Sequence, residues 1–587
     1  MSYTAPVDEL VFTLETVAGL SAAREAGATG DLGDDDARAI LTEAGRFAEE
    51  TLAPLNRVGD EEHSRREGRE VKTPAGWREA YAAFAQNGWG TLIGDPEYGG
   101  QGLPIALQTA VSDIWNQANS AFSLNPLLTA AAVEALQAHG TEVQKALYLP
   151  KLISGEWTGT MNLTEPQAGS DLGELKTRAV PDGERYRLFG QKIYISYGEH
   201  DLTDNIIHFV LARLPDAPDG SRGISLFLVP KFLVDEAGTL GARNDLACVG
   251  VEKKAGIHAS PTCTMAYGAD GEGALGELVG TPHKGLAAMF TMMNNARVQV
   301  GVQGAAVAER AFQHALAYAK ERRQGRAAGH DGPAPIAAHP DVRRMLLTMQ
   351  ALTRATRSMC YACAVAIDRG RSGLPDAAFW KARADLLTPI AKAFATDTGV
   401  EVASLGIQVH GGMGYIEESG AAQHWRDARI FPIYEGTNGI QAIDLVRRKI
   451  TLGDGAVLTA YLDELRDIGA AARGDNALHL ADFAAELDSA IDAVAAAAQQ
   501  LTAAMDSGHL DDALAGATPF LRALGTTAGG AYLAKAATAS GNTQAEGRAA
   551  LARLYGAAFL SGVPALARSA TRGAGDILAT DPAILAG

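Results

Sequence analysis

At 587 residues the chain is too long for one hydrophobic core, so we expect three or four domains. Apolar residues make up 47% of it, and a formal net charge of −18 argues against a nucleic-acid surface or a broad contact with an anionic membrane. The N-terminus lacks the basic region of a signal peptide, and no window approaches ~20 uncharged apolar residues. We therefore expect a cytoplasmic protein without a membrane span.

From about residue 35 to 160 the apolar spacing is helical, as in the stripe Trp77, Tyr81 and Phe84. We expect a break in the helices near Pro126, because proline interrupts the backbone hydrogen bonding of a helix. The loop at 94–102 is rich in glycine, which either permits tight turns or brings the backbone close to a ligand.

Between about 161 and 280 the period changes to two residues. Short β-branched and aromatic runs predict strands at 185–189, 192–196, 206–211 and 224–229, and thus a small barrel or sandwich. A GxGxxG match occurs at 271–276, but the dinucleotide fingerprint needs a following helix, and Gly280, Thr281 and Pro282 argue against one. We therefore reject an NAD-binding Rossmann domain.

Helices return from Leu286 to about 450. One is expected from Met289 to Arg322, and its basic end is either a solvated helix terminus or a clamp for a pyrophosphate. Cys360 and Cys363 form a CxxC without a second pair or a nearby histidine, which favours buried reduced thiols and no metal site.

Beyond Gly453 the composition becomes alanine-rich. Apolar residues at spacings of 3 and 4 from Leu480 to Met505 predict a packing helix of about seven turns. Residues 510–570 are expected to form two further helices, divided by Gly529-Gly530 and by Gly541.

The stretch 431–441 carries one carboxylate, Glu435, between an aromatic residue and a glycine. A helical pattern begins at Thr437, and the start of a helix offers free N–H groups to a developing negative charge. Apolar neighbours disfavour the charged form of a carboxylate, so the pKa of Glu435 can rise toward the range of a general base. The alternative is an ordinary loop glutamate in front of a helix.

Taken together, seven motifs resemble the acyl-CoA dehydrogenase family over about residues 40–450. They stand in the family order: PEYGG at 96–100, YLPKLISGE at 148–156, LTEPQAGSD at 163–171, KIYISYGEHD at 192–201, YAKERRQG at 318–325, QVHGGMGY at 408–415 and IYEGT at 433–437. The resemblance implies a mainly α fold with a central β domain, divided into a helical domain (1–160), a β-barrel domain (161–280), a helical bundle (281–452) and a C-terminal helical extension (453–587).

The resemblance also implies FAD and the α,β-dehydrogenation of an acyl-CoA thioester. Glu435 matches the family's catalytic base, which takes the α-proton while a hydride passes to the flavin. Substrate contacts are expected from Ser170, Arg297, Tyr434, Glu435 and Gly436. The family's flavin contacts match Met161, Leu163, Thr164, Gly169, Ser170, Tyr194, Ser196, Arg322, Gln324, Gln408, Gly411, Gly412 and Thr437. Because Arg322 and Gln324 match a contact to the flavin of the neighbouring subunit, at least a dimer is implied.

Several features depart from the family's usual motifs or indicate a subgroup within the family. Gly325 stands where the family usually has Phe, and Gly439 where it often has Gln. The N-terminus, GEHDLTDN at 198–205, HPDVRRML at 339–346 and the helical tail are most similar to the subgroup of methylthiopropanoyl-CoA dehydrogenases, which act in the degradation of dimethylsulfoniopropionate (DMSP). The helical extension is expected to cover the surface through which shorter relatives pair their dimers, so the protein would be a homodimer. Electron-transfer flavoprotein is the implied electron acceptor. The alternatives are a short- or medium-chain acyl-CoA dehydrogenase, an acyl-CoA oxidase and a non-catalytic acyl-CoA-binding scaffold.

Overall fold

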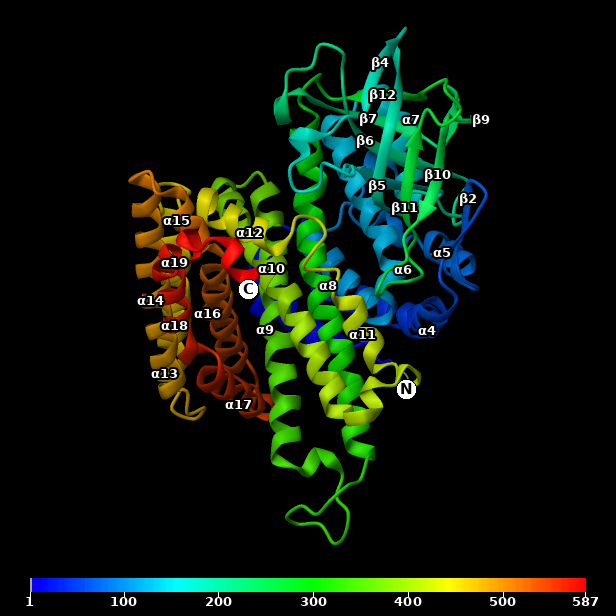
Figure 1. The fold of residues 1–587 in the computed structure, drawn as a ribbon. Coiled ribbons are helices and arrows are strands. Elements are labelled where there is room, and N and C mark those ends of the chain that lie inside the picture. The colour runs from blue at the N-terminus through cyan, green and yellow to red at the C-terminus, as the bar shows by residue number, and fades with distance from the viewer. Residues whose placement is uncertain (1–2, 587) are drawn as a thin grey trace. The chain divides into compact units, whose positions relative to one another are not determined.

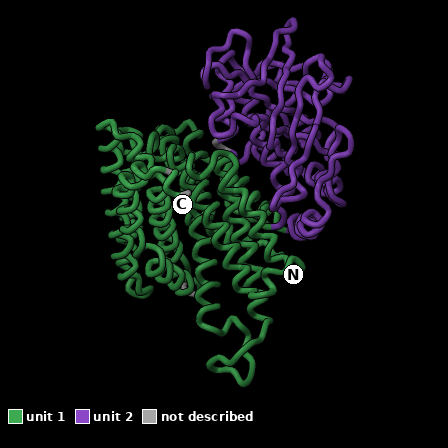
Figure 2. The backbone as a smooth tube through the Cα atoms, in the orientation of Figure 1, with its two compact units in different colours: residues 1–45, 104–117, 297–587 green, residues 46–103, 118–296 purple. Residues whose placement is uncertain are grey.

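The computed structural model describes residues 3–586, except the side chains of 294, 295, 542, 543, 582 and 586. These residues form two compact units, which are described separately (Figure 2). The helical unit comprises residues 1–45, 104–117 and 297–587, and the sheet unit comprises residues 46–103 and 118–296.

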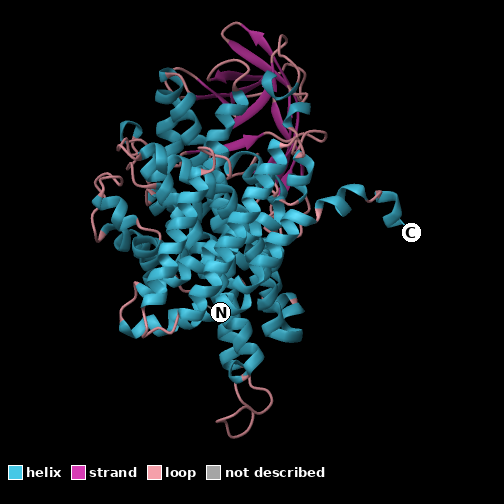
Figure 3. Cartoon of the chain, turned by 90° about the vertical axis from the view of Figure 1, so that its left-hand side faces the viewer, coloured by secondary structure: helices cyan, strands magenta, loops and turns pink. Residues whose placement is uncertain are grey.

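The sheet unit is built around strands that Figure 3 shows gathered in one region. Within the described residues, eight strands form one sheet in the order β10-β11-β5-β12-β7-β6-β3, with β4 paired to β5 and β6. The pairs are antiparallel except where β3 and β4 meet β6. The strands are β3 (Trp157–Asn162), β4 (Arg178–Asp182), β5 (Arg185–Ser196), β6 (Asn205–Arg213), β7 (Ile224–Pro230), β10 (Leu246–Val251), β11 (Thr262–Tyr267) and β12 (Ala274–Val279). The core between them is apolar and includes Leu188, Val210, Phe227 and Met265.

Two features predicted for this unit have different outcomes. The separate strands predicted at 185–189 and 192–196 are one strand, β5, which continues through Gly190. The GxGxxG match at 271–276 covers the turn before β12 and the first three residues of that strand. Gly271 and Gly273 adopt positive φ angles in the turn, and a strand follows instead of a helix. This agrees with the rejection of a dinucleotide-binding helix.

Smaller elements complete the sheet unit. Two hairpins are formed by β1 (Arg65–Glu67) with β2 (Glu70–Lys72) and by β8 (Phe232–Val234) with β9 (Leu240–Arg243). The helices are η2 (Ala48–Leu52), α4 (Ala53–Glu62), α5 (Trp77–Gln86), η3 (Trp89–Thr91), η4 (Pro96–Tyr98), α7 (Glu142–Ser154), η5 (Leu172–Glu174) and η6 (Gly220–Gly223).

Helix α6 (Ile105–His139) breaks at Asn119, and the expected break near Pro126 is wrong. Asn119 has φ −161° and ψ 91°, outside helical geometry, whereas Pro126 lies inside the helix. The Asn119 side chain accepts from the Phe122 N–H at 3.0 Å and donates to the Leu52 carbonyl at 3.3 Å. Asparagine thus caps the second half of α6, since its side chain can replace a backbone partner.

The helical unit contains long helices that pack side by side (Figure 1). α9 (Pro340–Arg371) packs along α10 (Ala377–His410), and α16 (Ala517–Thr538) packs against both. The other α-helices are α1 (Val7–Phe12), α2 (Leu20–Glu25), α3 (Asp36–Phe47), α8 (Gly285–Glu321), α11 (Ala421–Ala428), α12 (Asn438–Asp444), α13 (Ala456–Gly474), α14 (Ala481–Asp506), α15 (Leu510–Ala515), α17 (Asn542–Ala558), α18 (Val563–Arg572) and α19 (Ala574–Ala579). Short helical turns are η1 (Thr13–Val17), η7 (Ile336–Ala338), η8 (Gly411–Tyr415), η9 (Glu417–Ser419), η10 (Leu445–Lys449), η11 (Leu560–Gly562) and η12 (Pro582–Ala586). As predicted, Cys360 and Cys363 are buried in a helix interior.

Gly529 and Gly530 do not divide two helices, as the sequence suggested, but lie inside α16. A Cβ on Gly529 would come within 2.9 Å of the Tyr555 hydroxyl and 3.0 Å of Ala355, and one on Gly530 within 2.9 Å of Leu560. The glycines therefore allow a close approach of neighbouring helices, which offsets their low helix propensity.

One described stretch, 544–572, has the length and hydropathy of a membrane span, with 39% of its most apolar window buried. It leaves helical geometry at Phe559, between α17 and α18, and both of these helices pack against α14 and α16. The signal is weak, and the expected lack of a membrane span stays a prediction.

Candidate active site

Glu435 lies in the turn that leads into α12, and its backbone has an uncommon conformation. Its φ is 55° and that of Gly436 is 84°, so two successive residues occupy the left-handed region. Thr437 caps α12, as the sequence indicated, by accepting the Ile440 N–H on its hydroxyl at 3.3 Å. Non-glycine residues rarely adopt positive φ, and such strain gathers at functional sites.

Two cations from different helices surround this turn. Arg297 of α8 is buried, and a Cβ built on Gly436 would lie 3.8 Å from its Nη2. Lys392 of α10 is fully buried, and its ammonium donates to the Gly436 carbonyl at 2.9 Å and to Oδ1 of Asn438 at 2.8 Å. Both positive charges act on the Glu435 carboxylate and favour its ionised form.

Burial raises the pKa of Glu435 above its ordinary value, and the charges of Arg297 and Lys392 oppose this rise without cancelling it. The same burial lowers the pKa of Lys392 to about 7, although Glu435 and Asp397 favour its charged form. A carboxylate with a raised pKa is a better proton acceptor than an ordinary surface glutamate.

Tyr434 is fixed by a chain of hydrogen bonds that continues into α8 and α6. Its hydroxyl donates to Oε1 of Gln303, and Nε2 of Gln303 donates to Oδ1 of Asn116 at 3.2 Å. Burial raises the pKa of Tyr434 well above its ordinary value, so the hydroxyl stays protonated and continues to donate. The aromatic side chain of Tyr434, beside Glu435, therefore has a defined orientation.

In the sheet unit, the loop after β3 is held against β5 by a buried ion pair. Lys192 and Glu165 lie 2.8 Å apart, with exposed fractions of 0% and 4%. Lys192 also donates to the Leu163 carbonyl at 2.9 Å, and the Ile193 N–H donates to the Thr164 carbonyl at 2.9 Å. Burial alone would raise the pKa of Glu165, but Lys192 and the hydrogen bonds of Thr177 and Lys176 hold it at about 2.

The residues predicted to contact flavin in the sheet unit meet at this loop and strand. Tyr194 is 61% exposed and has φ 59°, while Gly169 and Ser170 are exposed at the end of the loop. Met161 is buried, whereas Leu163, Thr164 and Ser196 are half-buried. An exposed aromatic ring beside free hydroxyls and backbone groups suits a flat ring with a polar edge, such as an isoalloxazine.

In the helical unit, the other predicted contacts lie at the ends of α8 and α10. Arg322 and Gln324 are exposed just beyond α8, and Gln408, Gly411 and Gly412 are exposed at the end of α10. Tyr318 stacks on His410 with ring centroids 4.4 Å apart, which brings the two helix ends together. The loop after α8 therefore offers three exposed arginines, Arg322, Arg323 and Arg326, and the end of α10 offers exposed polar and glycine residues.

Lys392 and Gln303 were not among the residues predicted from the sequence. A signal for Lys392 existed, because it is the single charged residue in the apolar helical run 386–396. A lysine in such a run must find partners when it is buried. Its partners, however, lie 44 and 46 residues further along the chain.

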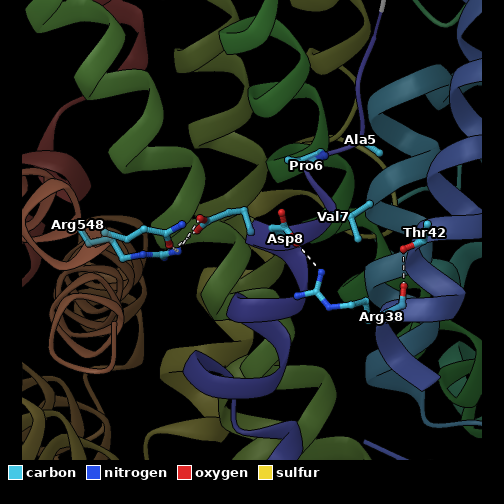
Figure 4. Close-up of a pocket in the computed structure, with 9 residues that line it drawn as sticks. Ala5, Pro6, Val7, Asp8, Arg38, Thr42 and Arg548 are labelled. Carbon is cyan, nitrogen blue, oxygen red and sulfur yellow. Dashed lines mark hydrogen bonds and ion pairs between the residues drawn. The ribbon is translucent and has the colours of Figure 1, made fainter. Parts of the chain in front are cut away.

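A separate cavity of about 470 Å³ lies in the helical unit, between the N-terminal segment, α3 and α17 (Figure 4). Its charged side chains are already paired, Arg38 with Asp8 and Arg548 with Glu9 at 2.9 Å. The cavity is therefore lined by ion pairs that join the N-terminal segment to α3 and α17.

Comparison with known proteins agrees with this geometry. Family models match residues 34–156 (acyl-CoA dehydrogenase, N-terminal domain), 160–267 (middle domain), 283–450 (C-terminal domain) and 461–581 (acetyl-CoA dehydrogenase C-terminal like). The chain belongs to the acyl-CoA dehydrogenase family. Members of this family use FAD, so this acyl-CoA dehydrogenase is an oxidoreductase that acts on acyl-CoA with FAD as its cofactor.

Individual relatives extend the comparison. A 3-methylmercaptopropionyl-CoA dehydrogenase of Ruegeria pomeroyi is 47% identical over 561 residues, which cover 93% of each chain. A butyryl-CoA dehydrogenase of Syntrophomonas wolfei is 34% identical over 74% of this chain and 73% of its own. The structure of Caenorhabditis elegans ACDH-11 in complex with C11-CoA shares the fold, with a TM-score of 0.77 and 22% identity over 94% of this chain and 91% of that one.

Proposed function

We propose that this acyl-CoA dehydrogenase oxidises short acyl-CoA thioesters to trans-2-enoyl-CoA, with 3-(methylthio)propanoyl-CoA as its preferred substrate. The similarity to the Ruegeria pomeroyi enzyme supports this choice, because it spans nearly the full length of both chains, including the C-terminal extension. Such a substrate would place the enzyme in DMSP degradation. The lower similarity to a butyryl-CoA dehydrogenase supports the second candidate, a short-chain fatty acyl-CoA.

Glu435 is proposed as the catalytic base that removes the α-proton. The observation that carries this proposal is a carboxylate with a raised pKa in a left-handed turn at the start of α12. Its own backbone N–H would donate to the thioester carbonyl as negative charge develops there, and one such donor typically contributes ~3–4 kcal/mol to the transition state. Bound FAD supplies the acceptor for the β-hydride.

The substrate and cofactor contacts are likewise proposals. Tyr434 and Gly436 would flank the acyl group, and Arg297 would lie near its CoA end. Ser170 would contact both substrate and flavin, and its exposure leaves it accessible to both. The flavin would be held by Met161, Leu163, Thr164, Gly169, Tyr194, Ser196 and Thr437, and by Arg322, Gln324, Gln408, Gly411 and Gly412 from a neighbouring subunit.

We further propose that the protein is a cytoplasmic homodimer and that it passes electrons to electron-transfer flavoprotein. Each chain would consist of four domains, divided at about residues 160, 280 and 452. The packing of α16 on α9, α10 and α12 supports the view that the extension covers part of the helical bundle. Sedimentation that shows a stable tetramer would contradict the dimer.

A substrate panel tests the function. Purified enzyme with a dye acceptor is expected to turn over 3-(methylthio)propanoyl-CoA with a higher kcat/KM than butanoyl-CoA or octanoyl-CoA. Equal values for all three would refute the sulfur preference. Release of peroxide without a dye would indicate an oxidase, and a flavin band that does not bleach on addition of acyl-CoA would indicate a scaffold.

The base is tested by Glu435→Gln. We expect retained FAD and a kcat lowered by at least about a thousandfold, because an amide cannot accept the α-proton at neutral pH. Flavin absorbance measures the first quantity and the dye assay the second. Near-normal turnover would refute the assignment.

A further inference from the structure

We propose that Lys392 is a positioning residue for the catalytic base, which holds the left-handed turn of Glu435 and Gly436 and supplies a positive charge that keeps the carboxylate deprotonated. This inference rests on the proposed role of Glu435. It concerns a residue that touches neither substrate nor flavin in the proposed mechanism, because its buried ammonium donates to acceptors of the protein itself.

Hydrogen bonds connect α10 to the turn, and we call the two that Lys392 donates, to Gly436 and to Asn438, the bracket. Lys392 reaches the Gly436 carbonyl at 2.9 Å and Oδ1 of Asn438 at 2.8 Å. The Asn438 amide in turn donates to Oδ1 of Asp397 at 2.7 Å and to Oγ1 of Thr396 at 3.0 Å. The residues on both sides of Thr437 are therefore tied to one face of α10.

The turn depends on this bracket because its own conformation is costly. A non-glycine residue at positive φ is strained, and it keeps this conformation only where its surroundings enforce it. Gln441 also donates to the turn, but its bonds to the Glu435 and Gly436 carbonyls are longer, at 3.3 and 3.4 Å. The bond from Lys392 is the shorter and charge-assisted one, which is the stronger kind.

The charge of Lys392 acts on Glu435 as well. The charged groups that face this pair are Arg297 on α8 and Asp397 on α10, and Arg297 itself faces Asp444 on α12. A positive charge near a carboxylate favours its ionised form, so loss of the lysine charge must raise the pKa of Glu435. Because a neutral amine still donates hydrogen bonds, deprotonation of Lys392 removes the charge and leaves the bracket.

Three variants separate the two contributions. Lys392→Met removes both the bracket and the positive charge. Lys392→Arg keeps the positive charge on a side chain of different geometry. Asn438→Ala removes the hydrogen bond between Lys392 and Asn438 and keeps the charge of Lys392. Lys535→Met is the matched control, because Lys535 is a half-buried lysine that, like Lys392, donates to a backbone carbonyl, that of Val17 at 2.8 Å, in a different part of the helical unit. FAD content, kcat, KM and the pH profile of kcat/KM are measured for each.

For Lys392→Met we expect retained FAD, a kcat lowered at least about tenfold, a KM changed less than about threefold, and an acid limb of the kcat/KM profile shifted to higher pH by about one unit. Lys392→Arg is expected to return the acid limb toward that of the wild type. Asn438→Ala is expected to lower kcat without moving the limb, and Lys535→Met to change neither.

A Lys392→Met enzyme with the wild-type acid limb and a kcat within about twofold of the wild type would overturn the inference. An equal shift of the limb in Lys535→Met would overturn it too. If Lys392→Met does not fold, an acid limb shifted to higher pH in Lys392→Arg, which keeps the charge, together with an unchanged kcat in Asn438→Ala would have the same effect. These results are distinct from a failure of the proposed function, which active Glu435→Gln would reveal.

Discussion

At the scale of single residues, the Glu435 turn combines a reactive side chain with a backbone that its neighbours must enforce. The left-handed conformation brings the Cβ of an L-residue close to its own backbone, so Glu435 carries a strain that Gly436 avoids. A β-carbon on Gly436 would also come within 2.8 Å of Nε2 of Gln441. A glycine is therefore required at position 436, directly after the proposed base.

Gly436→Ala is expected to lower kcat at least about tenfold and to destabilise the protein by about 1–2 kcal/mol, because alanine fits poorly at positive φ. Gly439→Ala is the matched control three residues further on, where the nearest neighbour of a Cβ, Oγ1 of Thr437, is 3.8 Å away. Kinetics with the dye acceptor and thermal unfolding measure both effects. Equal behaviour of the two variants would contradict the proposed constraint.

At the scale of elements, single residues determine where a helix begins and how closely two helices approach each other. Asp368 of α9 accepts the N–H groups of Ile105 and Ala106 at 2.8 and 2.9 Å and so caps the start of α6. Gly529 and Gly530 let α16 approach its neighbours. The extension thereby packs against α9, α10 and α12, and the last two of these helices contact or follow the Glu435 turn.

The cap at Asp368 predicts a pH dependence of stability. Burial raises the pKa of Asp368 to about 7, despite the two N–H groups that favour its charged form. The folded state therefore binds a proton that the unfolded state releases near pH ~4, and the stability from this group is present below about pH 4 and lost as the pH rises toward about 7. The loss amounts to at most about 4 kcal/mol for a shift of about three pKa units.

Asp368→Asn should remove this loss, since an amide does not titrate. Denaturant unfolding between about pH 4 and about pH 8 is expected to show a smaller decline in the free energy of unfolding for the variant than for the wild type. Parallel pH curves for the two proteins would show that Asp368 is not the group responsible.

At the scale of the whole molecule, the N-terminal segment and the C-terminal extension pack against each other within the helical unit. Arg548 of α17 pairs with Glu9 at 2.9 Å and lies 3.8 Å above the Phe12 ring, and Lys535 of α16 donates to the Val17 carbonyl. The N-terminal segment is also anchored by Tyr3, whose hydroxyl donates to the Ile114 carbonyl at 3.2 Å. The extension therefore stabilises the first residues of the chain as well as the helical bundle.

Arg548→Met is expected to lower the free energy of unfolding by about 2 kcal/mol, because the partly buried Glu9 loses one of its two arginine partners and keeps Arg354 at 3.3 Å. Arg473→Met, which breaks an exposed ion pair with Asp488, should cost less than about 1 kcal/mol. Denaturant unfolding and protease cleavage within residues 3–25 measure the difference. Equal costs would contradict the role of Arg548 in holding the N-terminal segment.

The sequence alone determined the family, the mainly α fold with a central β domain, FAD and the reaction class, because these follow from motifs in which the informative residues are close neighbours in the chain. It also indicated Glu435 as the base and Thr437 as the start of a helix, since a capping hydroxyl and a helical period are local signals. The assignment of individual contacts to substrate and flavin remains a prediction.

Only the tertiary structure decided where α6 bends, why two glycines stand inside α16 and which cations face the base. The break at Asn119 depends on Leu52, the glycines on Ala355, Tyr555 and Leu560, and the Glu435 turn on Lys392 and Arg297. These partners are separated by tens of residues or more along the chain. Their proximity follows from the packing of whole helices, which local sequence patterns do not specify.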